Sequence, residues 1–265
     1  MGIINLTPDS FSGDGLMSGK DPEKEAINQA LQFVREGADI LDLGAESSRP
    51  GAEPISAEEE IRRLIPALEA ILKEKLDVVI SVDTYKNQVA EKALQAGADW
   101  INDIWGLRFD PRMASIVFKY NSPVVIMHNG RKLEQDREVP EKENQKDIVL
   151  RVKGGLQESI QITQKANIPP SNMILDPGIG FGKTVDENLE LINRLDEIRA
   201  MGYPLLIGPS RKSFIGAVLN LPSDQRLEGT AAATAISITR GADIIRVHDV
   251  EAIARVAKIC DAILR

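Results

Sequence analysis

Eight short apolar runs are spread along the 265 residues of the chain, and most of them end at a polar residue. The runs are nearly continuous in aliphatic residues instead of alternating with polar ones, which indicates strands buried on both faces, as in a parallel sheet. They cover residues 2–5, 40–43, 78–83, 100–103, 124–128, 173–176, 205–208 and 244–248.

Segments with the apolar period of an amphipathic helix separate most of these runs. They cover residues 22–36, 57–73, 87–95, 147–166, 185–200, 229–239 and 250–264. Eight alternations of strand and helix close best as a (β/α)8 TIM barrel, a fold of about 250 residues. We therefore predict one α/β domain over residues 1–265. A doubly wound open sheet is the alternative, but its usual six strands would leave two runs unused.

Composition narrows the classes of function. The formal net charge of −8 argues against binding to nucleic acid or to an acidic membrane surface. Cys260 is the single cysteine, so the chain has no internal disulfide. No apolar run reaches the roughly 18 residues of a membrane span, and no signal peptide opens the chain. We expect a soluble, cytoplasmic protein.

Polar residues stand at the ends of nearly all the predicted strands. In a barrel of this kind the active site lies at the carboxyl ends of the strands, so these residues converge on one rim and predict a small-molecule pocket. They are Asn5, Asp42, Asp83, Asn102, Asp103, His128, Asp176, Arg246 and His248, followed after the seventh strand by Ser210, Arg211, Lys212 and Ser213.

The residue types on this rim suit a flat nitrogen heterocycle. A carboxylate pairs with a planar N–H/NH2 edge through two parallel hydrogen bonds, and Asp83, Asn102 and Asp176 offer such acceptors and an amide. Lys212 is a donor suited to a ring oxygen or nitrogen on the other side. The alternative is a structural network in which Asp83 and Asp176 pair with Lys212 and Arg246.

A second group of rim residues suits an anion. Asn5 and the pair Arg246 and His248 belong to the first and eighth strands, which adjoin in a closed barrel. A cation, an imidazole and an amide fit a phosphate or diphosphate, and the amide oxygen of Asn5 could also bind a Mg²⁺ ion that bridges such a group.

Several other kinds of site are disfavoured. Residues 178–184 (GIGFGKT) are similar to a nucleotide phosphate loop, but Pro177 occupies the position of its first glycine. Two histidines and one cysteine make no cluster with zinc spacing. No G-x-S-x-G nucleophile elbow is present, so a covalent serine mechanism is disfavoured.

Seven segments form a further pattern, in order and mostly at strand ends. They are residues 1–12 (MGIINLTPDSFS), 43–52 (LGAESSRPGA), 81–84 (SVDT), 101–103 (IND), 176–184 (DPGIGFGKT), 208–216 (GPSRKSFIG) and 246–248 (RVH). Each is moderately specific. Together they resemble the dihydropteroate synthase family of pterin-binding enzymes, over nearly the whole chain.

The resemblance implies a reaction and its participants. Members of the family join 6-hydroxymethyl-7,8-dihydropterin diphosphate to p-aminobenzoate in folate biosynthesis, giving 7,8-dihydropteroate and pyrophosphate, with Mg²⁺. The mechanism is SN1-like: pyrophosphate leaves first, and the amine then attacks the pterin methylene cation. Family members are usually homodimers.

The resemblance also implies a role for each matching residue. The pterin would lie on Asp83, Asn102, Asp176, Lys212 and Met127, and the diphosphate on Asn5, Arg246 and His248, with Mg²⁺ on Asn5. The p-aminobenzoate pocket would be lined by Phe11, Ser48, Arg49, Pro50 and Ser213. The catalytic residues would be Asp83 and Lys212, with Asp9 and Asp14 of the first loop.

Two alternatives stay open at this point. A related barrel that transfers a methyl group from methyltetrahydrofolate would share the pterin site, but it would not need the Ser-Arg-Pro-Gly loop or Arg246 with His248. A catalytically silent paralogue that binds pterin or a partner protein is the other alternative.

Overall fold

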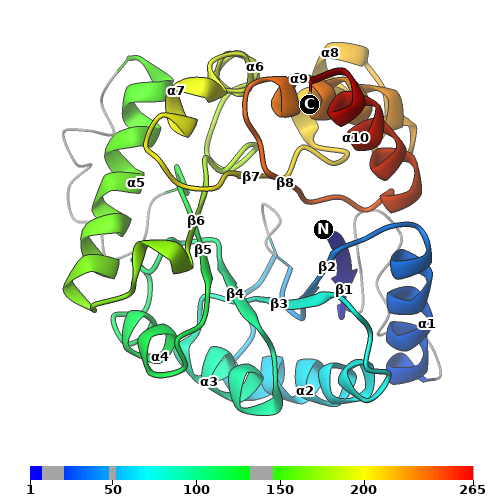
Figure 1. The fold of residues 1–265 in the computed structure, drawn as a ribbon, viewed down its shortest axis with the longest axis vertical. Coiled ribbons are helices and arrows are strands. Elements are labelled where there is room, and N and C mark those ends of the chain that lie inside the picture. The colour runs from blue at the N-terminus through cyan, green and yellow to red at the C-terminus, as the bar shows by residue number, and fades with distance from the viewer. Residues whose placement is uncertain (8–20, 48–51, 132–145, 265) are drawn as a thin grey trace.

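The eight predicted strands form the inner wall of a barrel, and helices make a ring around it (Figure 1). The computed structural model describes residues 1–7, 21–47, 52–131 and 146–264. The strands are β1 (Gly2–Asn5), β2 (Ile40–Gly44), β3 (Val79–Asp83), β4 (Trp100–Asp103), β5 (Val124–Met127), β6 (Met173–Asp176), β7 (Leu206–Ile207) and β8 (Ile244–Ile245). Each lies within or beside a predicted apolar run.

Parallel pairing closes these strands into a ring. Strands β1 to β6 form one sheet in sequence order, and β7 pairs with β8. Two isolated parallel bridges join the sheets, one between Leu175 and Leu205 and one between Gly2 and Val247. At the second seam the Val247 amide donates to the Met1 carbonyl over 2.9 Å. The prediction of a (β/α)8 barrel is confirmed, and an open sheet is wrong.

The helices match the amphipathic segments closely, with three differences. They are α1 (Pro22–Arg35), α2 (Ala57–Lys73), α3 (Asn87–Ala96), α4 (Met113–Lys119), α5 (Ile148–Lys165), α6 (Val185–Asn193), α7 (Leu195–Arg199), α8 (Ser213–Leu219), α9 (Leu227–Thr239) and α10 (Val250–Leu264). The single helix predicted over residues 185–200 is wrong, because Arg194 leaves helical geometry and divides it into α6 and α7. Helices α4 and α8 span seven residues each, too few to show a period.

Side chains point alternately into and out of the barrel along each strand. The outward residues, such as Leu41, Leu43 and Val82, belong to the large core beneath the helices. Inward residues of β5, β6 and β7 form a separate small cluster of Val125, Ile174 and Leu206. The helices therefore hold most of the apolar packing, which leaves inward positions on the other strands for polar residues.

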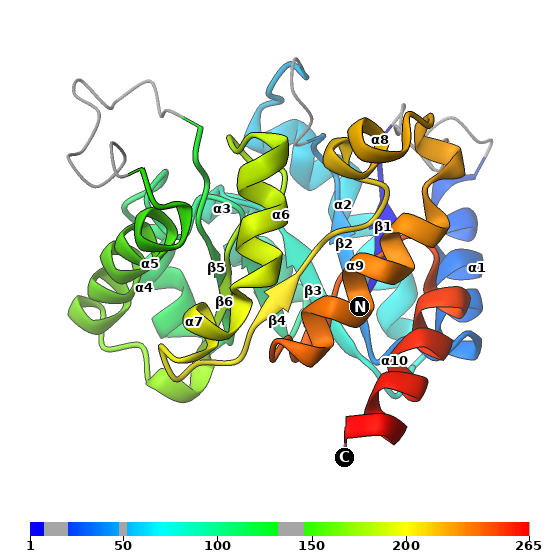
Figure 2. The same cartoon turned by 90° about the horizontal axis from the view of Figure 1, so that it is seen from above.

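The two ends of the barrel differ. Helix α8 lies across the end where the strands finish, and α10 carries the C-terminus toward the opposite end (Figure 2). No helix in the described ranges is long and apolar enough to cross a membrane.

Candidate active site at the carboxyl ends of the strands

Three of four neighbouring strands bring a polar side chain to one level of the barrel, and the fourth has a glycine there. The parallel register aligns Asn5 of β1 with Gly44 of β2, Gly44 with Asp83 of β3, and Asp83 with Asn102 of β4. All four residues occupy positions whose side chains point into the barrel. On β5 and β6, Val125 and Ile174 occupy the same level. The level is thus polar on one half and apolar on the other, as a flat heterocycle with a polar edge requires.

Asp42 lies one inward position below this level and organises its polar half. The carboxylate has no exposed surface and accepts three hydrogen bonds. Ser81 Oγ donates over 2.6 Å, Asn102 Nδ2 over 3.0 Å and Arg246 Nε over 2.6 Å. The charge of Asp42 is therefore paired and fully hydrogen-bonded, as a buried carboxylate needs to be.

Asp83 shares the Arg246 guanidinium with Asp42. Arg246 Nη2 donates to Asp83 Oδ2 over 2.8 Å, while 17% of the Asp83 side chain stays exposed. Burial raises the pKa of Asp83 well above its ordinary value, and the charge of Arg246 opposes this shift. When Asp83 is ionised, two carboxylates and one guanidinium leave a net negative charge at this part of the site.

Asp176 and Lys212 face the same end from the other side of the barrel. Asp176 Oδ1 accepts the Gly178 amide over 2.7 Å. Lys212 precedes α8, and its ammonium donates to the Ile179 carbonyl and lies 4.6 Å from the centre of the Phe181 ring. Burial lowers the pKa of Lys212 to about 8, with the charge of Asp176 opposing the shift.

The site leaves no room for a side chain at Gly180. Its φ is +81°, and an added Cβ would lie 2.8 Å from Lys212 Cδ. We expect Gly180→Ala to lower the free energy of unfolding by about 1–3 kcal/mol and to raise the KM for a substrate bound at this site, because Lys212 must move. Thermal unfolding and steady-state kinetics measure the two effects.

Gly202→Ala is the matched control for this substitution. Gly202 has a φ of +89°, but a Cβ there would meet nothing within 4 Å. It should lose similar stability with no change in KM. If Gly180→Ala also left KM unchanged, the position of Lys212 would not matter for substrate binding at this site.

The residues predicted to bind diphosphate lie close together, but Arg246 has more partners than the sequence suggested. His248 contacts Ser210, with 3.0 Å between Nδ1 and Oγ. Arg246 forms ion pairs with Asp42 and Asp83. The pairing that the alternative of a structural network expected is present between Asp83 and Arg246. Asn5 ends β1 on the inward side, half-buried.

Other predicted positions fall on different faces or outside the described residues. Met127 is inward on β5 and pairs in register with Asp176. Ser213 is exposed at the start of α8. The residues expected in the first two loops lie outside the described residues: Asp9, Phe11, Asp14, Ser48, Arg49 and Pro50.

Two strand-end candidates do not face the site. Asp103 has the opposite parity to Asn102, and its carboxylate accepts the Trp105 and Leu107 amides over 2.8 and 2.9 Å. His128 packs beneath α5, where a Cβ on Gly155 would clash with its ring. The prediction that these two residues lie on the rim was wrong, because a residue at a strand end reaches the pocket only if its side chain points into the barrel.

The segment that resembles a phosphate loop is held in another way. Lys183 Nζ donates to the carbonyl oxygens of Gly178, Phe181 and His128 over 2.8, 3.1 and 3.2 Å. In a phosphate loop this lysine would instead reach the phosphates. The prediction that the segment binds no nucleotide phosphate in that way agrees with these contacts.

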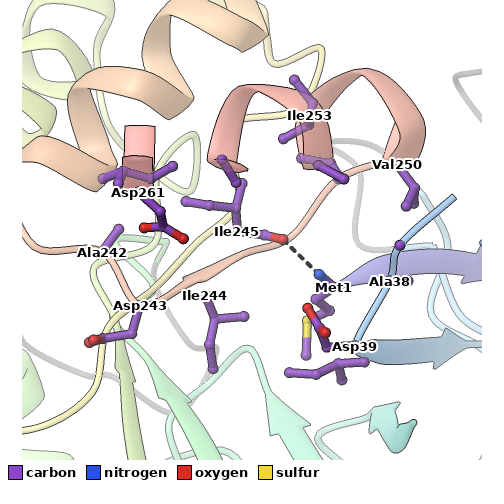
Figure 3. Close-up of a pocket in the computed structure, with 16 residues that line it drawn as sticks. Met1, Ala38, Asp39, Ala242, Asp243, Ile244, Ile245, Val250, Ile253 and Asp261 are labelled. Atoms are coloured by element: carbon purple, nitrogen blue, oxygen red, sulfur yellow. Dashed lines mark hydrogen bonds between the residues drawn. The ribbon is translucent and has the colours of Figure 1, made fainter. Parts of the chain in front are cut away.

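A separate cavity of about 300 Å³ opens at the opposite end of the barrel. Its lining includes Met1, Asp39, Ile244 and Ile253, where β1, β2 and β8 begin, and the Met1 amine donates to the Ile245 carbonyl over 2.9 Å (Figure 3). None of the predicted site residues lines it. The chemistry expected from the sequence therefore belongs to the other end.

The fold and this arrangement of carboxylates, amide and lysine are those of a barrel suited to a nitrogen heterocycle at its strand ends. Residues 1–248 match the family model described as pterin binding enzyme, and the chain belongs to that family. The names of similar proteins indicate a particular activity within this family. A dihydropteroate synthase of Bacillus subtilis is 48% identical over 264 residues, covering 100% of this chain and 88% of its own length.

Solved structures agree with this relationship. A Clostridium difficile dihydropteroate synthase determined with pteroic acid has a TM-score of 0.89 at 46% identity, and the match covers 100% of this chain and 96% of that one. The Xanthomonas albilineans dihydropteroate synthase with 4-aminobenzoic acid has a TM-score of 0.89 at 37% identity, covering 99% and 92%. The expected family and fold are thereby confirmed.

Proposed function

We propose that this chain is a transferase that joins 6-hydroxymethyl-7,8-dihydropterin diphosphate to p-aminobenzoate and releases pyrophosphate. The observation that carries the proposal is the convergence of inward-facing Asp83, Asn102, Asp176 and Lys212 at one end of the barrel. Relatives that are dihydropteroate synthases support it across the whole chain. The product would be 7,8-dihydropteroate, in folate biosynthesis. We further propose that the enzyme works in the cytoplasm.

The geometry suits a reaction in which the leaving group departs first. The bond between the pterin methylene carbon and the diphosphate oxygen breaks, and the electron pair leaves with pyrophosphate. The negative charge beside Asp83 stabilises the methylene cation, since electrostatic stabilisation acts where charge develops. The amine of p-aminobenzoate then attacks the carbon and loses a proton.

In this mechanism Arg246 has N–H donors left to bind the departing pyrophosphate. Its Nε and Nη2 bind Asp42 and Asp83, while Nη1 donates to no residue in the described ranges. With His248 on the same strand end, it would bind the diphosphate. The carboxylates thus hold the guanidinium in place, and the fork geometry of arginine suits phosphate oxygens.

Asn5 fits a role as a magnesium ligand. The amide lies inward at the end of β1, next to the β8 end that carries Arg246, and amide oxygen is a hard donor of the kind Mg²⁺ prefers. No described residue hydrogen-bonds its side chain. Bound there, Mg²⁺ would neutralise charge on the diphosphate.

The direct test mixes the purified protein with the pterin diphosphate, p-aminobenzoate and Mg²⁺, and measures pyrophosphate and dihydropteroate together. We expect both products in equal amounts, and a lower rate when EDTA removes Mg²⁺. Pterin binding without pyrophosphate release would favour the silent paralogue. Methyl transfer from methyltetrahydrofolate would favour the related barrel enzyme.

We also propose that the chain forms a homodimer through α9 and α10. These helices pack together, and they expose Ile236, Ile259 and Ile263, which are 47%, 63% and 76% accessible. Exposed apolar side chains on two helices that pack together suit an interaction surface.

Light scattering during gel filtration tests the dimer. We expect a mass of twice 29.0 kDa, and a monomer for the double variant Ile259→Asp with Ile263→Asp. Phe118→Asp is the control, because Phe118 is 51% exposed on the distant helix α4. A monomeric unsubstituted protein would contradict the proposal.

A further inference from the structure

The carboxylate of Asp42 has no surface through which it could touch a substrate, yet it bonds two residues that do reach the mouth. It sits in the middle of β2, paired in register with Ile3 of β1 and Ser81 of β3. Its Oδ1 accepts from Ser81, and its Oδ2 accepts from both Asn102 and Arg246. The two oxygens therefore differ in their partners, since only Oδ2 contacts residues that are predicted to bind substrate.

The first consequence concerns the amide of Asn102. An ionised carboxylate only accepts hydrogen bonds, so the NH2 end of Asn102 must face Asp42, and the two ends of the amide cannot exchange. The carbonyl oxygen Oδ1 points away from Asp42, and no residue in the described ranges donates to it. Asn102 consequently offers an acceptor, not a donor, to a ligand.

The second consequence concerns Arg246. Its Nε is held by Asp42 over 2.6 Å and its Nη2 by Asp83 over 2.8 Å, from two adjacent strands. Two fixed bonds define the plane of the guanidinium. The Nη1 donors are thereby aimed from a rigid support, and a long side chain loses little further freedom when it binds an anion.

We propose that Asp42 is a positioning residue that sets the hydrogen-bonding polarity of the site, turning Asn102 into an acceptor for a ring N–H and holding Arg246 for the diphosphate. This inference rests on the proposed function, because it takes the pterin diphosphate as the ligand. Asp42 acts only through its two neighbours.

The test compares Asp42→Asn with Ser81→Ala. Asp42→Asn keeps the shape but removes the acceptor-only carboxylate, so Asn102 can reverse and Arg246 loses one ion pair. We expect the dissociation constant and KM for the pterin diphosphate to rise about thirtyfold. Ser81→Ala removes the hydrogen bond to the other oxygen, so it should lower the melting temperature and change pterin binding less than threefold.

The outcomes separate this inference from the proposed function. A purely structural role would make pterin affinity follow melting temperature in both variants, and this result would overturn the inference. Unchanged pterin binding in Asp42→Asn would also overturn it. Failure of the unsubstituted chain to bind the pterin diphosphate would instead overturn the proposed function.

A second comparison applies if Asp42→Asn does not fold. Asn102→Asp places two carboxylates face to face, whereas Asp42→Asn combined with Asn102→Asp restores one amide and one carboxylate with their places exchanged. The combined variant still presents an acceptor oxygen at position 102. We expect it to bind the pterin diphosphate at least about tenfold more tightly than Asn102→Asp alone. Equal affinity would overturn the role of Asp42.

Discussion

Replacing Asp83 by asparagine is expected to lower kcat/KM by about a thousandfold while the barrel stays folded. The asparagine oxygen can still accept from Arg246 Nη2, so the substitution removes mainly the negative charge. In the proposed mechanism that charge stabilises the methylene cation. Pyrophosphate release under steady-state conditions gives the rate, and circular dichroism with thermal unfolding confirms the fold.

Asp103→Asn is the matched control for Asp83→Asn. Both carboxylates are buried at neighbouring strand ends, and burial raises the pKa of Asp103 to about 7, just as burial raises that of Asp83. Asp103, however, faces outward and binds the Trp105 and Leu107 amides. We expect its variant to lose stability and keep kcat/KM within about fivefold. Equal losses of activity in the two variants would contradict the assignment of Asp83.

Replacing Lys212 by alanine is expected to lower kcat/KM by about a hundredfold, mainly through a higher KM for the pterin substrate. The lysine loses its proton as the pH rises through about 8, because burial lowers its pKa to that value. In the unsubstituted enzyme kcat/KM should therefore fall above about pH 8, since this quantity reports groups of the free enzyme. In Lys212→Ala that alkaline fall should disappear.

Lys183→Ala serves as the control for Lys212→Ala. Lys183 belongs to the neighbouring loop, but its ammonium donates to the backbone carbonyl oxygens of Gly178, Phe181 and His128. The variant should unfold at a lower temperature and keep the alkaline fall in kcat/KM. An alkaline fall that persists in Lys212→Ala would show that another group titrates.

The sequence allowed most of the barrel to be predicted, because each strand and long helix has a local signature. The apolar run over residues 173–176 and the amphipathic period over residues 57–73 match β6 and α2 at both ends. The break at Arg194 and the short helices α4 and α8 depend on tertiary packing, which no local period records.

The site was predicted less completely, for two physical reasons. Asp103 and His128 were grouped with the rim, although the parity of Asn102 and Asp103 already places the two on opposite faces. The importance of Asp42 could not be judged in advance, since its partners lie 39, 60 and 204 residues away along the chain. Its one sequence signal was a charged residue in the middle of the otherwise apolar segment ILDLG.

The strands of the barrel differ in how continuously they are paired with their neighbours. Strands β1 to β6 form a continuous sheet, whereas β7 and β8 contribute two residues each and join it through single bridges. Asp83 and Asn102 thus stand on the stiff part of the wall, which suits recognition of a rigid ring. Lys212, Arg246 and His248 follow β7 and β8, but Arg246 takes its fixed position from Asp42 and Asp83 on the continuous sheet. Strand pairing therefore fixes the acceptors proposed for the pterin ring, whereas ion pairs between side chains, and not strand pairing, fix the arginine proposed for the departing anion.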